Sequence, residues 1–107
     1  MVDVEKELIA VNQTICAAID SRRVLRFYYG GGPRTVEPHC YGRSRKGDEL
    51  LRGYQTGGYS ESGESVGWKL FRVSDISGLQ LTGDSFVGPR AGYNPQDSAM
   101  EIVFCRL

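Results

Sequence analysis

Arginines gathered in the middle of the chain are the residues with the clearest chemical potential. Between residues 22 and 52, seven arginines and one lysine accompany three acidic residues, while the 107-residue chain as a whole is neutral. A planar guanidinium presents two parallel N–H donors, which suits recognition of a phosphate or a carboxylate. Basic side chains on strand edges also discourage aggregation between sheets. The sequence therefore leaves two interpretations open, an anionic partner and a solvated basic edge.

Aromatic residues alternate with these cations in a way that favours a ligand pocket. In extended strands, Arg52 would share a face with Tyr54, and Glu37 and His39 would share one with Tyr41. A phosphate with an attached base needs both cations and stacking surfaces. The alternative is that the rings are core and rim residues anchored by a hydroxyl or indole hydrogen bond. The predicted ligand-binding residues are Arg34, His39, Tyr41, Arg52, Tyr54, Lys69 and Arg72.

Two further hypotheses use other surfaces. Arg43, Arg45 and Lys46 fall at a predicted hairpin tip, where they could track the backbone of single-stranded nucleic acid with steep salt dependence. In the other hypothesis the chain is an assembly module without a small ligand. It would form a homodimer or bind a separate regulatory protein through its N-terminal helix or through an edge strand at 100–104.

Catalytic and metal chemistry find little support. The single histidine, His39, has no second histidine or nearby Ser/Asp pair, so a hydrogen-bonded structural role is favoured over catalysis. Glu61 and Glu64 lie in a Ser/Gly-rich loop that is poorly suited to holding two carboxylates apart. The glycine cluster at 30–32 lacks the Lys-Ser/Thr ending of a phosphate-binding loop. We expect no enzyme activity, no metal and no cofactor.

The cysteines and the N-terminus indicate the cellular compartment in which the protein is expected. Cys16, Cys40 and Cys105 are odd in number, widely spaced and without a Cys-x-x-Cys pair, so neither a disulfide framework nor a zinc site is indicated. We interpret them as small buried hydrophobic residues. No apolar run could span a membrane, and the acidic N-terminus is unlike a signal peptide. A cytoplasmic protein without membrane contact is predicted.

Apolar periodicity predicts one helix over residues 3–21. The apolar positions repeat at helical spacing, Asp3 is a candidate N-cap, and Arg22 and Arg23 follow the C-terminal end. The resulting stripe is a docking face for the sheet, with helix-mediated dimerisation as a minor alternative. The positions of the stripe are Val4, Leu8, Val11, Ile15, Ala18 and Ile19.

Turn-bounded β runs follow the helix and predict a mainly β, single-domain chain. Pro38 lacks a ladder donor, so it belongs at an edge, a bulge or a corner. Consecutive strands should form a meander that curls into a small barrel over about 23–82, followed by an extension at 83–107 whose apolar run 100–105 could close the sheet or pair with a partner. The predicted strands are 24–29, 35–41, 50–55, 68–73 and 76–81.

Three segments at this spacing resemble the bacterial WYL domain. They are Arg34-Thr35-Val36-Glu37-Pro38, Leu50-Leu51-Arg52-Gly53-Tyr54 and Lys69-Leu70-Phe71-Arg72-Val73-Ser74-Asp75-Ile76, followed by Phe86; the similarity runs from about Ile15 to Phe86. The resemblance implies an SH3- or Sm-like barrel. It also implies a sensory module, often attached to a DNA-binding domain, with a basic pocket for nucleic acid or a nucleotide-like ligand.

This chain departs from the family pattern at the pocket. Glu49-Leu50-Leu51 stands at the Trp-Tyr-Leu tripeptide, and Lys69 and Asp75 replace two arginines of the later strand. Lys is a point charge and Asp reverses the sign, so an anion pocket built from those two positions is weakened. The leading hypothesis is a non-enzymatic, ligand-sensing regulatory module whose anion pocket includes Arg34, Arg52, Lys69 and Arg72.

Overall fold

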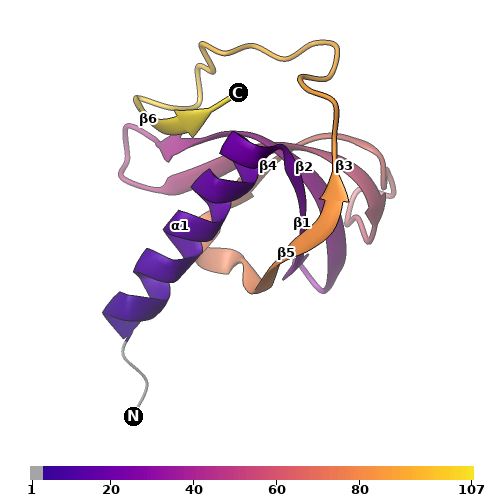
Figure 1. The fold of residues 1–107 in the computed structure, drawn as a ribbon, viewed down its shortest axis with the longest axis horizontal. Helices are drawn as coiled ribbons and strands as arrows, with labels where there is room; N and C mark the ends of the chain where they lie inside the picture. Colours follow the sequence, from indigo (N-terminus) through magenta and orange to yellow (C-terminus); the bar gives the residue numbers. More distant parts are fainter. Residues whose placement is uncertain (1–3) are drawn as a thin grey trace.

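One helix and a six-stranded antiparallel sheet make up residues 4–107, the part of the chain that the structure describes (Figure 1). The structure is a computed structural model that describes the backbone of residues 4–107 and the side chains of residues 10–107. The mainly β prediction with one N-terminal helix is confirmed, while the proposed N-cap, Asp3, lies outside the described residues. The elements are α1 (Val4–Ser21), β1 (Arg23–Tyr29), β2 (Gly32–Arg43), β3 (Glu49–Gly58), β4 (Gly67–Arg72), the 3-10 turn η1 (Val73–Asp75), β5 (Ser77–Ser85) and β6 (Ile102–Arg106).

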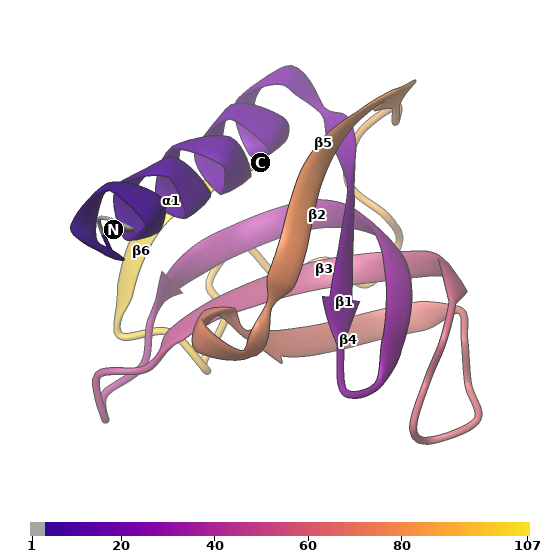
Figure 2. The ribbon, with the colours of Figure 1, turned by 90° about the horizontal axis from the view of Figure 1, so that it is seen from below.

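The sheet is open and curled, in the order β4-β3-β2-β1-β5, with β6 added beside β2 (Figure 2). The first four strands form the predicted meander. A two-residue turn joins β1 to β2, and both of its residues, Gly30 and Gly31, have positive φ, which glycine adopts without steric cost. The fifth strand departs from the meander, because β5 pairs with β1 and not with β4. This arrangement is compatible with the expected small barrel.

A bulge in the middle of β2 decides which side chains share a face. Against β3, Pro38 lies opposite Gly53 and Cys40 lies opposite Arg52, so His39 is an extra residue in β2. Such a bulge interrupts the alternation of faces. The predicted bend at Pro38 is therefore confirmed. The expected common face for Glu37, His39 and Tyr41 is wrong, because Tyr41 points to the interior while Glu37 lies on the opposite face.

The interior of the curled sheet is filled by α1. The side chains of Ile15, Ala18 and Ile19 are fully or almost fully buried there, as the predicted docking stripe requires. They meet a cluster of sheet residues at whose centre the rings of Phe27 and Phe71 pack edge to face at 5.0 Å. Burial of this apolar stripe is what orders the helix against the sheet.

The C-terminal end of α1 is tied to the far end of β5. Arg22 has a φ of 54°, a left-handed conformation that ends the helix, and its backbone N–H donates to the Ile19 carbonyl. The Arg22 guanidinium donates to the carbonyl of Val87, and that of Arg23 donates to the carbonyl of Thr82. These two arginines therefore act on the sheet as well as following the helix.

A disulfide joins Cys16 of α1 to Cys105 of β6, across 89 residues of sequence. The expectation that both are simple buried hydrophobic residues is wrong, because they are bonded to each other. Their spacing in the sequence does not reveal that β6 returns beside α1. Cys40 is the buried free cysteine that the sequence predicted. Burial raises the pKa of its thiol to about 11, so the thiol stays protonated and unreactive at neutral pH.

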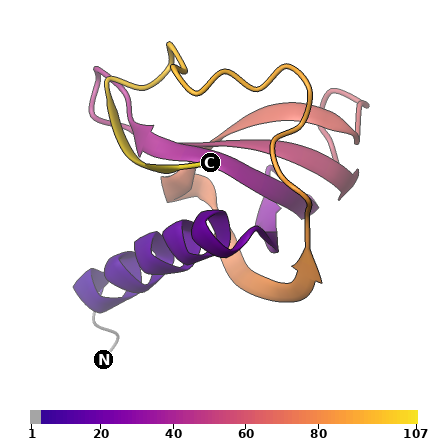
Figure 3. The ribbon, with the colours of Figure 1, turned by 45° about the horizontal axis from the view of Figure 1, so that its top comes forward.

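The segment between β5 and β6, residues 86–101, crosses the sheet on the side opposite α1 (Figure 3). We call this segment the strap. It lies over β2, β3 and β4, and the sheet is thus covered by a helix on one face and by irregular chain on the other. Within the described residues, no helix is long and apolar enough to cross a membrane.

Candidate functional site

The face of the sheet beneath the strap collects polar and aromatic side chains from three strands. Glu37, Tyr54 and Trp68 form one row across β2, β3 and β4, because each lies opposite the next in register. Arg52 belongs to the neighbouring row on the same face. The predicted common face of Arg52 and Tyr54 is therefore observed, and the strap completes the site from above.

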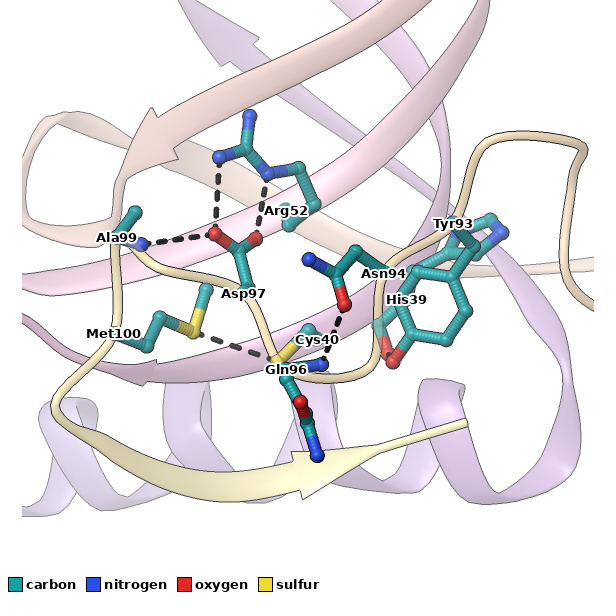
Figure 4. Close-up of polar contacts among 9 residues, drawn as sticks. All are labelled: His39, Cys40, Arg52, Tyr93, Asn94, Gln96, Asp97, Ala99 and Met100. Atoms are coloured by element: carbon teal, nitrogen blue, oxygen red, sulfur yellow. Dashed lines mark hydrogen bonds and ion pairs between the residues drawn. The ribbon is translucent and has the colours of Figure 1, made fainter.

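Arg52 of β3 binds the carboxylate of Asp97, which belongs to the strap (Figure 4). Its Nε donates to Oδ2 at 2.7 Å and its Nη2 donates to Oδ1 at 3.2 Å. Asp97 Oδ1 also accepts the backbone N–H of Ala99 at 3.0 Å. The hydrogen bonds from Arg52 are the main reason that the pKa of Asp97 lies below its usual range. Arg52, whose side chain is 28% exposed, thus binds a carboxylate through two hydrogen bonds.

A second ion pair lies nearer the start of the strap. In this pair the strap supplies the cation and the sheet supplies the carboxylate. Arg90 of the strap donates through Nε and Nη2 to the two carboxylate oxygens of Glu37, at 2.7 and 2.9 Å. The same guanidinium stands 4.5 Å from the ring centroid of Tyr54. The Glu37 side chain is only 9% exposed, so its charge is compensated by the strap and not by water.

Aromatic rings from both layers surround His39. Its ring is edge-on to Trp68 at 4.7 Å and to Tyr93 at 5.2 Å, and it stacks on Phe86 at 5.7 Å. Trp68 and Tyr93 lie nearly parallel, with centroids 6.1 Å apart. The strap and the sheet therefore share one aromatic cluster.

The imidazole of His39 is fully buried and both of its nitrogens have partners. Nε2 accepts the backbone N–H of Arg90 at 3.1 Å, so Nδ1 carries the proton and donates to the Glu37 carbonyl at 2.8 Å. Burial lowers the pKa of this histidine and keeps the ring neutral. This is the hydrogen-bonded histidine favoured by the sequence, and in its place it anchors the strap.

A cavity of about 250 Å³ opens beside the Arg52–Asp97 pair. Both ion-paired side chains contribute to its wall, and Trp68 and Tyr93 add aromatic surface. Sequence reasoning did not single out Tyr93, Asp97 or Arg90 as site residues. The residues typical of turns in the extension 83–107 were the one available indication, and they do not show which part of the sheet these turns contact. The cavity is lined by Arg52, Trp68, Gly92, Tyr93, Asn94, Asp97 and Ser98.

Other predicted ligand-binding residues lie away from this cavity. Arg34 is 4% exposed and donates to the Tyr29 carbonyl and to Gln55, with its guanidinium among three aromatic rings. Tyr41 belongs to the core, and its hydroxyl forms hydrogen-bonding contacts with the side chains of Asn12 and Glu49. Both side chains hold the interior together, and neither reaches the face beneath the strap.

Lys69 and Arg72 of β4 are also separated from the cavity. The ammonium of Lys69 donates to the carbonyl of Glu64 at 2.7 Å and so fastens the loop between β3 and β4. Arg72 lies at the end of β4, 54% exposed and 4.0 Å from the carboxylate of Asp48. The structure thus brings Arg52, Tyr54 and His39 beneath the strap and distributes the other four predicted residues elsewhere.

The alternative nucleic-acid residues lie together at the β2–β3 hairpin. Arg43, Arg45 and Lys46 are all exposed. The tip is shaped by a hydrogen bond from the Ser44 N–H to the Asp48 carbonyl, at 2.8 Å. Arg72 reaches the same tip through Asp48, so four cationic side chains lie near one end of the molecule.

The comparisons with known proteins give one structural neighbour. The fold is similar to part of proteasome accessory factor B/C (PafBC) of Arthrobacter aurescens, with a TM-score of 0.63 and 25% sequence identity. The similarity covers 79% of this chain and 13% of that protein, so the chain corresponds to a small part of its neighbour. No family model and no curated protein matches the sequence.

Proposed function

We propose that this chain is a WYL-like sensory module that binds an anionic, nucleotide-like ligand beneath the strap, with Arg52 as the principal anion contact. The observation that carries the proposal is the two-point grip of Arg52 on a carboxylate at the wall of a cavity. Phosphate oxygens use the same pair of parallel donors. The structural similarity to part of a proteasome accessory factor supports a regulatory role.

The surroundings of Arg52 fit a ligand that has a ring as well as a charge. Trp68 and Tyr93 present nearly parallel faces, and stacking of a base on such rings contributes about 1–3 kcal/mol. Of the ligand-binding residues predicted from the sequence, only Arg52, Tyr54 and His39 would belong to this site. Arg52 would bind the anion, Tyr54 would hold Trp68 through their edge-to-face contact, and His39 would hold the floor of the site in place.

Ligand binding can be tested by thermal shift and calorimetry with adenosine 5′-monophosphate, using adenosine as the uncharged control. The nucleotide should stabilise the protein saturably and adenosine should do so weakly, because only the former offers oxygens to Arg52. Arg52→Gln should remove the difference between the two compounds. Arg26→Gln, which neutralises an exposed arginine on β1, should preserve it. Equal binding by wild type and R52Q would refute the assignment.

A second candidate function is single-stranded nucleic-acid binding at the β2–β3 hairpin. The specific observation is the exposure of Arg43, Arg45 and Lys46 beside Arg72 at one end of the sheet. Binding there should strengthen with oligonucleotide length and fall steeply with salt, because it depends on counterion release. R45Q with K46Q should weaken it while leaving mononucleotide binding unchanged. Affinity that is independent of length and salt would refute this candidate.

The assembly hypothesis stays a proposal, through α1 or through β6. Within the described residues β6 pairs with one strand only, β2, and it is joined to α1 by the disulfide. Self-association would use either of these two elements. Light scattering over a wide concentration range tests it, and a strictly monomeric protein would remove it.

A further inference from the structure

The strap is held to the sheet by ion pairs, hydrogen bonds and the ring of Tyr93 along its middle, and by buried apolar side chains at its two ends. Phe86 and Met100 are buried, and every residue from 87 to 99 is exposed or only partly buried. Val87 is 96% exposed. The middle of the strap could therefore move away from the sheet without uncovering the apolar core on the other face.

Asp97 takes the position on Arg52 that an external anion would occupy. Its two oxygens use Nε and Nη2, the pair of parallel donors that a phosphate or a carboxylate would bind. An incoming anion that adopts this two-point geometry can do so only after Asp97 has left. The side chain of Asp97 is 8% exposed, so in the closed arrangement it is largely shielded from water.

The size of the cavity also indicates that a ligand needs more space than the closed strap leaves. Pockets for small ligands usually measure about 300–1,000 Å³. The space beside Arg52 is about 250 Å³ with the strap closed, and all of its lining residues except Arg52 and Trp68 belong to the strap. Outward movement of the strap would enlarge the cavity and free Arg52 at the same time.

We propose that the strap is a displaceable internal competitor: Asp97 occupies the anion position of Arg52 in the unliganded protein, and an incoming phosphate ester replaces it and releases the strap around 94–99. Tyr93 stays against His39 and Trp68, where it can still stack on the ligand. This rests on the proposed function, which supplies the ligand. Displacement is the event that a sensory module needs, because the free and the bound states then differ in the position of a defined segment.

The ends of the strap determine how such a movement would be transmitted. The strap begins directly after β5 and ends directly before β6, which pairs with β2 and is covalently joined to α1 through Cys105. The segment is thus fixed at both ends and would lift as a loop. The turn before β6 is closed by Asp97 itself, whose carbonyl accepts the Met100 N–H at 3.1 Å. Loss of the Arg52 pair would loosen this turn directly beside the strand that contacts α1.

The test is the affinity for adenosine 5′-monophosphate of the Asp97→Asn variant, with Glu101→Gln as the matched control. D97N keeps the size of the side chain but removes the competing charge, so its affinity should rise about tenfold or more. E101Q neutralises an exposed carboxyl of the strap outside the cavity and should leave the affinity within about twofold of wild type. Unchanged or weaker binding by D97N, with R52Q still defective, would overturn the strap proposal and retain the proposed function.

Hydrogen exchange gives a second readout that does not depend on affinity. D97N should accelerate exchange at the backbone amides of Ala99 and Met100 while β3 stays protected, and saturating nucleotide should produce the same pattern in the wild type. Slow exchange at these amides in D97N would overturn the proposal. If the strap opens in D97N and the variant still binds no nucleotide, an accessible Arg52 fails to take the anion, and both proposals fall.

Discussion

The two faces of the curled sheet are covered by different kinds of contact. On the interior face, α1 buries Ile15, Ala18 and Ile19 against aliphatic and aromatic side chains, and a disulfide fastens the helix to β6. On the outer face, the strap is fastened by the pairs Arg52–Asp97 and Glu37–Arg90. Dry apolar packing is tight and hard to rearrange, whereas ion pairs at a partly exposed site exchange readily with water or ligands. The interior face supplies stability, and the outer face is suited to change.

Replacing one aromatic residue on each face by alanine should give the largest difference in the free energy of unfolding. Phe71→Ala should lower the free energy of unfolding by about 3–5 kcal/mol, because the cavity would open in the middle of a packed core. Tyr93→Ala should lower it by about 1 kcal/mol or less, because the strap opens separately from the rest of the fold. Urea denaturation measures both values. Equal losses would show that the strap is part of the same cooperative unit as the core.

The disulfide should contribute the next largest effect. Replacing both Cys16 and Cys105 with serine should cost about 2–4 kcal/mol, since the bond closes a long loop in the unfolded chain. A reductant should lower the Tm of the wild type to about that of the double variant. The Tm of the double variant itself should not change with reductant, which supplies the control. If reduction does not alter the wild-type Tm, α1 is held by packing alone.

A free-thiol assay on protein from cells would also test the predicted cytoplasmic location. Disulfides are rare in that compartment and persist in oxidising ones. Full oxidation of Cys16 and Cys105 in freshly isolated protein would argue against the cytoplasm, and reactive thiols at these positions would support it.

Protonation of His39 should have the smallest effect on global stability and a selective one on the strap. The pKa of His39 in the folded protein lies below 6.5, so its contribution is complete above pH 6.5 and is lost as the pH falls towards the folded-state value. A protonated ring could no longer accept the Arg90 N–H. The charges of Glu37 and Arg90, the nearest to the ring, oppose each other's effect on it.

The single tryptophan reports this change, because Trp68 packs edge-on against His39. Its fluorescence should be constant at mildly alkaline pH and change as the pH falls below 6.5. His39→Gln should remove that transition. An identical pH profile in wild type and variant would show that another group controls the outer face.

Several features of the fold were readable from short stretches of sequence. The apolar repeat predicted the helix that is described up to Ser21, Pro38 indicated the bulge, and glycines marked the turns. Arg52 and Tyr54 were correctly assigned to one face, because no irregularity lies between them in β3. Tyr41 was assigned to the wrong face because one extra residue, His39, reverses the alternation, and a sequence does not say which residue is bulged.

By itself, then, the sequence determined the helix, the strands, the turns and the excess of arginine, since each depends on neighbours a few residues apart. Tertiary structure alone decided which arginine meets an anion, which cysteines are bonded and what covers the outer face. Asp97 is 45 residues from Arg52, and Cys105 is 89 residues from Cys16. Contacts at such separations depend on how β5, the strap and β6 return across the sheet, and local periodicity carries no record of that path.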